Sequence, residues 1–275
     1  MEVDISLFSN HNQFVILRVG EQAYALPASQ VREMLVLPEV TEVPRAPSHL
    51  RGIISPRGEV LPLFDLRRRL GRRSLAEEAE ELLEMIDTRE QEHRQWLNEL
   101  ESCISEGREF TLPTDPAKCA FGQWYQNFTT NDLALASLLE RLASPHRRIH
   151  EVAGKALEAL SKEGQDAAQE IIDRARRVTL PKLLELFGEL KRLIRETHQE
   201  IAVILENGRH TMALAVDNVD SVELLQPENL QDLDRFGPAD GTRDLLESVG
   251  RRANGETVYI LKTAEFFQAA TDLTF

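Results

Sequence analysis

The segment LRGIISPRGEVLPLFDL (residues 50–66) decides how the amino-terminal part of this chain folds. It contains the turn Arg57-Gly58-Glu59, which is followed by the apolar run Val60–Leu66. Apolar runs bounded by glycine, proline and charged residues are typical of strands. Upstream, the runs Phe14–Val19 and Ala23–Leu26 have the same character. The amino-terminal part is therefore predicted to be rich in β-strands.

The β-rich pattern returns after about residue 200. Three apolar runs lie there: Ile201–Leu205, Met212–Val216 and Thr257–Leu261. Asn-Gly turns precede the last two, which is a typical signal for turns between strands.

The two β-rich parts resemble each other in spacing. Gly20 and Val31 are eleven residues apart, as are Gly208 and Val219, and a Gly-Glu pair precedes a five-residue strand run in both parts. We interpret this as a duplicated β unit.

The residues between these parts, 72–198, are rich in Leu, Ala, Glu and Arg at helical spacing. One stripe consists of Leu82, Ile86, His93, Leu97, Leu100 and Ile104. Further helices are predicted to begin near Leu133, at the start signal Ser144-Pro145, near Asp166, and at Pro181 with an end near Thr197. Four or five antiparallel helices would form an inserted all-α bundle.

Composition excludes several classes of protein. The net charge of −14 argues against nucleic-acid binding, which needs a dense basic surface. No apolar run approaches the roughly 20 residues that span a bilayer, so direct membrane insertion is not expected. The segment Met1–Ile5 lacks the features of a signal peptide. With two cysteines, a disulfide framework is not expected, and a reducing cytosolic compartment fits best.

The β-rich parts carry the motif of a known family. Val43-Pro44, Gly52-Ile53, Arg57-Gly58 and Pro62-Leu63-Phe64-Asp65-Leu66 occur in the order found in CheW-like chemotaxis adaptors, which this chain resembles over residues 13–71 and 199–270. The resemblance implies a pair of five-stranded barrels, the carboxy-terminal part forming the second, and no catalysis. It also implies partners, the chemoreceptor signalling tips and a CheA-type histidine kinase, and a cytoplasmic location at receptor arrays. Arg57 is then a candidate receptor contact, although a simple surface arginine would look the same.

Four residues in the helical part could bind one metal ion. His146 and His150 are four residues apart and so share a helix face. His93 lies on the apolar stripe of its helix and so points into the bundle, while Cys119 follows a Pro/Asp-rich connection where a helix could start. Three imidazoles and one thiolate suit tetrahedral Zn²⁺ better than Mg²⁺ or Ca²⁺, which prefer oxygen.

The same residues resemble the chemoreceptor zinc-binding domain. Its signature is Cys119-Ala120-Phe121-Gly122-Gln123-Trp124-Tyr125, preceded by a helix histidine, here His93, and followed by His-x-x-x-His, here His146 and His150. The resemblance implies that the insert, residues 72–198, binds zinc and senses zinc or oxidants.

Other interpretations remain open. A lone histidine on an apolar stripe is commonly a core residue, and the remaining histidines (His11, His49, His198 and His210), Cys103, Phe121 and Trp124 are expected to be structural. A zinc hydrolase would need an open coordination position and a general base, for which Glu151 is adjacent to His150. Arg147, however, occupies the position of the glutamate in an H-E-x-x-H motif. An adaptor with purely structural zinc is the third possibility. The basic run Arg67–Arg73 is expected to be a solvated face, offset by the acidic residues downstream.

Overall fold

The computed structural model describes residues 12–130, 132–233 and 242–271. His11 and the segment Met1–Ile5 lie outside the described residues. The chain divides into two compact units, residues 1–77 with 198–275 and residues 78–197. Within the described ranges, no helix is both long and apolar enough to cross a membrane.

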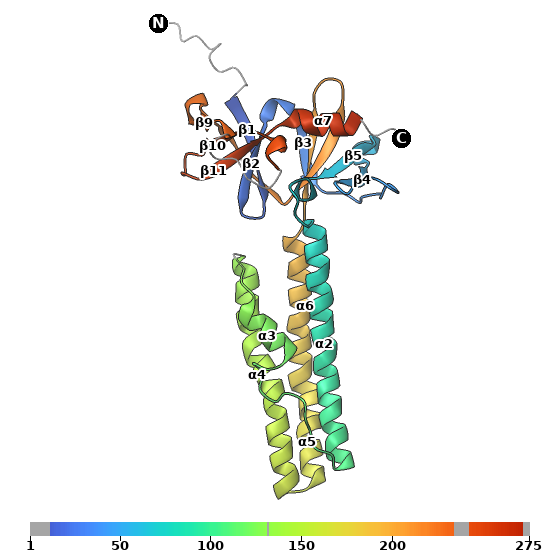
Figure 1. Cartoon of the computed structure of the whole chain (residues 1–275). Helices are drawn as coiled ribbons and strands as arrows, with labels where there is room; N and C mark the ends of the chain where they lie inside the picture. The colour runs from blue at the N-terminus through green and yellow to red at the C-terminus, as the bar shows by residue number, and fades with distance from the viewer. Residues whose placement is uncertain (1–11, 131, 234–241, 272–275) are drawn as a thin grey trace. The chain divides into compact units, whose positions relative to one another are not determined.

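The first unit consists of two β-sheets (Figure 1). The six-stranded sheet has the order β8-β1-β2-β11-β10-β9, with bounds Asn218–Leu224, Gln13–Val19, Gln22–Pro27, Thr257–Leu261, Leu246–Arg251 and Leu230–Gln231. The five-stranded sheet has the order β3-β6-β7-β5-β4, with bounds Val31–Val36, Ile201–Glu206, Thr211–Val216, Leu61–Asp65 and Leu50–Ile54. The predicted pair of β units is confirmed as these two sheets. One sheet has a sixth strand because the two-residue strand β9 pairs with β10.

Each sheet combines strands from both β-rich parts of the sequence. The hairpin β1–β2 lies between β8 and β11 of the second part, and the hairpin β6–β7 lies between β3 and β5 of the first. The pairs β2–β11 and β5–β7 are parallel. A two-stranded hairpin leaves two unpaired edges, and here each edge is completed by the other copy of the duplicated unit. The carboxy-terminal part, which resembles the family's second barrel, therefore contributes strands to both sheets.

Both faces of the central strands are buried, which explains their nearly continuous apolar sequences. In β1, Val15 and Leu17 belong to an apolar cluster that both sheets share, whereas Phe14 and Ile16 belong to a cluster of the six-stranded sheet alone. The five-stranded sheet likewise has its own cluster, which includes Ile204. Helix α7 (Thr263–Thr271) adds Phe266 to the shared cluster.

Ion pairs involve the basic run at residues 67–73. The Arg67 side chain is almost buried and its Nε lies 2.7 Å from Asp217. Arg68, on the short helix α1 (Leu66–Arg69), pairs with Glu77 at 2.7 Å. The prediction that downstream acidic residues compensate the charge of the basic run is thus confirmed for Glu77. The expectation of a solvated face is wrong for Arg67, because its partner Asp217 comes from the distant second part.

The second unit is the inserted helical bundle (Figure 1). It contains α2 (Leu75–Glu106, which begins in the first unit), α3 (Ala120–Asn127), α4 (Leu133–Lys162), α5 (Gln165–Arg174) and α6 (Leu180–Thr197). Its core is a separate apolar cluster drawn from all five helices, including Leu97, Phe121, Leu142, Ile172 and Phe187. The predicted helical insert is confirmed.

One predicted helix start, at Ser144-Pro145, is wrong. Helix α4 begins earlier, where the Asp132 side chain accepts hydrogen bonds from the N–H groups of Ala134 and Leu135, and it continues through Pro145. Proline in a helix interior removes one backbone hydrogen bond and strains the preceding turn. The apolar stripe of α4 is buried on both sides of Pro145, so burial outweighs that local cost.

Helices α5 and α6 are joined by a π-helical turn, Ala175–Thr179. Around this turn the buried residues Ala168, Ile172 and Ala175 and then Leu180 and Leu183 follow steps of three or four, except for the five-residue step from Ala175 to Leu180. The wider turn takes up the extra residue and leaves Val178 exposed. Pro181, at the second position of α6, has no N–H to close an ordinary turn there.

Candidate metal centre

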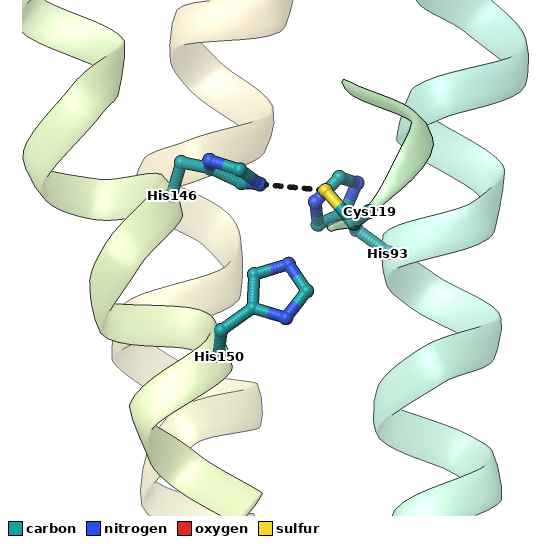
Figure 2. Close-up of side chains that lie close together, drawn as sticks. All are labelled: His93, Cys119, His146 and His150. Carbon is teal, nitrogen blue, oxygen red and sulfur yellow. Dashed lines mark hydrogen bonds between the residues drawn. The ribbon is translucent and has the colours of Figure 1, made fainter. Parts of the chain in front are cut away.

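The four side chains predicted as ligands lie around one point in the bundle. His93 comes from α2, His146 and His150 come from α4, and Cys119 immediately precedes α3. Figure 2 shows these side chains pointing toward one another. One potential ligand atom from each residue lies within 4.8 Å of the others.

Backbone carbonyls orient two of the imidazoles. Nδ1 of His93 lies 2.6 Å from the carbonyl oxygen of Arg89, and Nδ1 of His150 lies 3.1 Å from that of Pro113. A carbonyl oxygen only accepts hydrogen bonds, so each Nδ1 carries the proton and each Nε2 keeps a free lone pair. Both Nε2 atoms are buried and lack a hydrogen-bond partner among the described residues. Such orphaned, buried acceptors are what a metal ion would satisfy.

Cys119 is placed by the start of α3. Its Sγ accepts a hydrogen bond from the N–H of Gly122 at 3.2 Å, in the position of a helix N-cap, and lies 3.1 Å from Nε2 of His146 (Figure 2). The amino terminus of a helix favours a negatively charged sulfur. Only glycine fits at residue 122, because a Cβ there would lie 1.8 Å from the carbonyl oxygen of Pro116.

The protonation states suit metal binding. Burial lowers the pKa of His146 to about 3 and that of His150 to about 4, and it also lowers the pKa of His93. All three rings are therefore neutral near pH 7. Burial raises the pKa of the Cys119 thiol, while N–H groups of Gly122 and Phe121 act in the opposite direction. A bound metal would displace the thiol proton.

The donor set fits Zn²⁺, which prefers four nitrogen and sulfur ligands in tetrahedral sites. When bound, zinc would cross-link α2, the start of α3 and α4.

A cavity of about 290 Å³ adjoins the cluster and is lined by Cys119, Lys118 and Trp96 among others. The Cys119 side chain is thus partly accessible rather than fully buried.

Glu151 does not face the cluster. It is exposed and pairs with Lys155 at 3.2 Å and with Arg147 at 3.7 Å. Cys103 is buried, with its Sγ 3.2 Å from Glu99, which agrees with the structural role expected for it.

Arg57 lies in the first unit, on the 3₁₀ turn Pro56–Gly58 between β4 and β5. Its backbone φ of 52° is in the left-handed region, which a non-glycine residue adopts rarely. The side chain is 85% exposed and pairs with Glu33 on β3 at 2.9 Å. It is therefore available to a partner protein.

Sequence reasoning missed the residues that surround the ligands. Phe187 of α6 packs against His93 with ring centroids 5.8 Å apart, and Trp96 packs against His150 at 5.0 Å. Trp96 could have been noticed, because it lies on the same helix three residues after His93. The Arg89 and Pro113 carbonyls have no sequence signal, because any residue has a carbonyl group.

Comparisons with known proteins agree with this architecture. A family model for the CheW-like domain matches residues 13–93 and 140–271, and one for the chemoreceptor zinc-binding domain matches residues 93–157. A probable chemotaxis protein CheW of Rhizobium etli is 35% identical over 66 residues, which are 24% of this chain and 43% of that protein. Protein FrzA of Myxococcus xanthus is 40% identical over 60 residues, 22% of this chain and 38% of that protein. The matches thus span less than half the length of these curated relatives.

Among solved structures, the scaffolding protein TtCheW from Thermoanaerobacter tengcongensis aligns with 91% of this chain and 84% of its own, at 13% identity and a TM-score of 0.41. The CheW-like family model covers well over half of the chain, in two segments that precede and follow Cys119. The resemblance expected from the sequence is confirmed: the chain belongs to the CheW-like domain family and contains a chemoreceptor zinc-binding domain.

Proposed function

We propose that this protein is a non-enzymatic chemotaxis adaptor that couples chemoreceptor signalling tips to a CheA-type histidine kinase. It would act in the cytoplasm, at receptor arrays, through the β scaffold of residues 13–71 and 199–270. The observation that carries the proposal is the strand exchange between the two β parts. Residues on either side of the insert build both sheets, so the scaffold is one complete unit despite the interruption.

Arg57 is proposed as part of the receptor interface. Substitution of Arg57 by glutamate should weaken binding of a purified signalling-tip fragment at least tenfold, or about 1.4 kcal/mol. The melting temperature should change little, because the side chain is 85% exposed and its pair with Glu33 is a surface pair. Arg209→Glu is a matched control, since Arg209 is also exposed on a turn. Receptor binding that is unchanged in Arg57→Glu, or reduced equally in both variants, would contradict this role.

The insert, residues 72–198, is proposed as a zinc-binding sensory element with His93, Cys119, His146 and His150 as ligands. Its two ends continue into β5 and β6, which belong to the same sheet. A change in helix packing within the insert would therefore act on one sheet of the scaffold. The input would be zinc itself or an oxidant, because a zinc-bound thiolate is a nucleophile that oxidation converts into a poor ligand.

Oxidation of Cys119 is the step to test. Wild type and Cys119→Asp are compared in a reconstituted receptor–kinase assay with dilute hypochlorous acid, following zinc release, helix content and kinase activity. In wild type the oxidant should release zinc and change kinase activity, because Cys119 lines the cavity. Cys119→Asp should not respond, because its metal site has no thiol and the remaining cysteine, Cys103, is buried. If kinase activity changes equally in both proteins, or in neither, Cys119 is not the switch; zinc loss without effect on the kinase would favour a structural role for the metal.

The hydrolase alternative has less support. Four protein ligands would close the coordination sphere of zinc, and the candidate base Glu151 pairs with Lys155 on the exposed side of α4.

A further inference from the structure

The carbonyl oxygen of Pro113 accepts two hydrogen bonds that converge from different helices. Nε1 of Trp96, on α2, donates at 2.9 Å, and Nδ1 of His150, on α4, donates at 3.1 Å. Pro113 itself belongs to the connection that leads to Cys119. One oxygen atom thus links three of the segments that supply the metal ligands.

Trp96 is held firmly in this position. Only 5% of the residue is exposed, and its ring packs edge-on against both Phe110, at 5.2 Å, and His150, at 5.0 Å. A buried indole N–H needs a hydrogen-bond partner, and the described structure provides the Pro113 carbonyl. The Trp96 N–H thus gives the Pro113 carbonyl a second donor besides His150.

The position of that carbonyl determines what His150 can do. Because Nδ1 donates to the carbonyl, Nε2 carries the lone pair, and the direction of the hydrogen bond sets the direction in which Nε2 points. Trp96 lies about one turn after His93 on α2. One rigid helix therefore positions both the His93 imidazole and the indole that bonds to the Pro113 carbonyl, and that carbonyl in turn orients His150.

We propose that Trp96 is a positioning residue for the metal: its indole N–H holds the Pro113 carbonyl where it orients His150. This inference rests on the zinc binding proposed above and adds a determinant of affinity outside the four ligands. Loss of such an outer hydrogen bond typically lowers metal affinity 10- to 100-fold.

The test compares Trp96→Phe with Trp124→Phe in the full-length chain. Trp124 is the matched control, because it packs against Phe121 and Phe128 in the same bundle but does not bond to Pro113. Zinc affinity is measured by competition with a chelator. Trp96→Phe should bind zinc about 10- to 100-fold more weakly than wild type, whereas Trp124→Phe should remain close to wild type.

A second readout separates positioning from packing. With Co²⁺ in place of zinc, Trp96→Phe should shift the ligand-field bands, which report the arrangement of the imidazoles, while the thiolate charge-transfer band of Cys119 persists. A general loss of packing would weaken both bands together.

If Trp96→Phe loses helix content, the N–H can be removed without changing the shape of the side chain. The chain has two tryptophans, so in a Trp124→Phe background benzothienylalanine can replace Trp96 alone, with sulfur in place of the indole nitrogen. The same loss of zinc affinity is expected.

Three outcomes would overturn the inference. The first is wild-type zinc affinity in Trp96→Phe or in the benzothienylalanine protein, and the second is equal weakening in the Trp96 and Trp124 variants. The third is a wild-type chain that binds no zinc at all, which would overturn the proposed zinc function as well and is distinguished from the other two by the wild-type measurement.

Discussion

Alanine at both His146 and His150 is expected to abolish stoichiometric zinc binding. The substitutions remove two of four ligands and leave only His93 and Cys119, which cannot form a closed tetrahedral site. Structural zinc in small peptides contributes about 10–16 kcal/mol of apparent binding free energy, so this is the largest effect we predict. Metal analysis of the purified protein should fall from about one zinc per chain to near zero.

The loss of zinc should destabilise the insert and leave the stability of the β scaffold unchanged, because the two have separate apolar cores. Thermal unfolding followed by circular dichroism should show an earlier helical transition and an unchanged β transition. His210→Ala is the control, since His210 is exposed on the turn before β7 and lies outside the cluster. Full metal content in the double variant would show that these histidines are not ligands.

Substitution of Gly122 by alanine is expected to weaken the same metal site, although it replaces none of the four ligands. Its Cβ would lie 1.8 Å from the carbonyl oxygen and 2.9 Å from the carbonyl carbon of Pro116. These are backbone atoms, so no side-chain rotation relieves the overlap, and either α3 or the connection before it must move. Cys119 is the N-cap of α3, so its sulfur moves as well. We expect zinc affinity to fall more than tenfold, with a lower melting temperature of the insert.

Gly154→Ala provides a control in which the same substitution should raise the melting temperature rather than lower it. Apart from its chain neighbours and the backbone of its own helix, a Cβ at Gly154, in the interior of α4, would meet no atom of the described residues within 4 Å. Alanine favours a helix over glycine by roughly 0.8–1 kcal/mol. That variant should melt at a slightly higher temperature and bind zinc as wild type does. Wild-type zinc affinity in Gly122→Ala would mean that the close approach of Pro116 is not needed for the site.

The sequence by itself determined the local features of this protein. Apolar runs bounded by turn residues located the strands β1, β2, β5, β6, β7 and β11, and apolar residues at helical spacing located most of the helices, because both patterns reflect burial of a few neighbouring residues. Residue chemistry identified the four candidate ligands, since thiolate and imidazole at these spacings have few other uses together. The turn at Arg57 was likewise recognisable from its motif, and the structure places that side chain in solvent.

Only the tertiary structure decided how these pieces combine. Strand exchange between the β parts depends on pairing between residues about 200 positions apart, such as Arg18 with Asn218, and a local pattern does not specify it. Pro145 lies inside a helix and Ala175–Thr179 forms a π turn because buried apolar stripes outweigh the local preferences of the backbone. The Pro113 carbonyl orients His150 through a group that every residue possesses. Its role arises from its position in space, and so no residue type in the sequence could have indicated it.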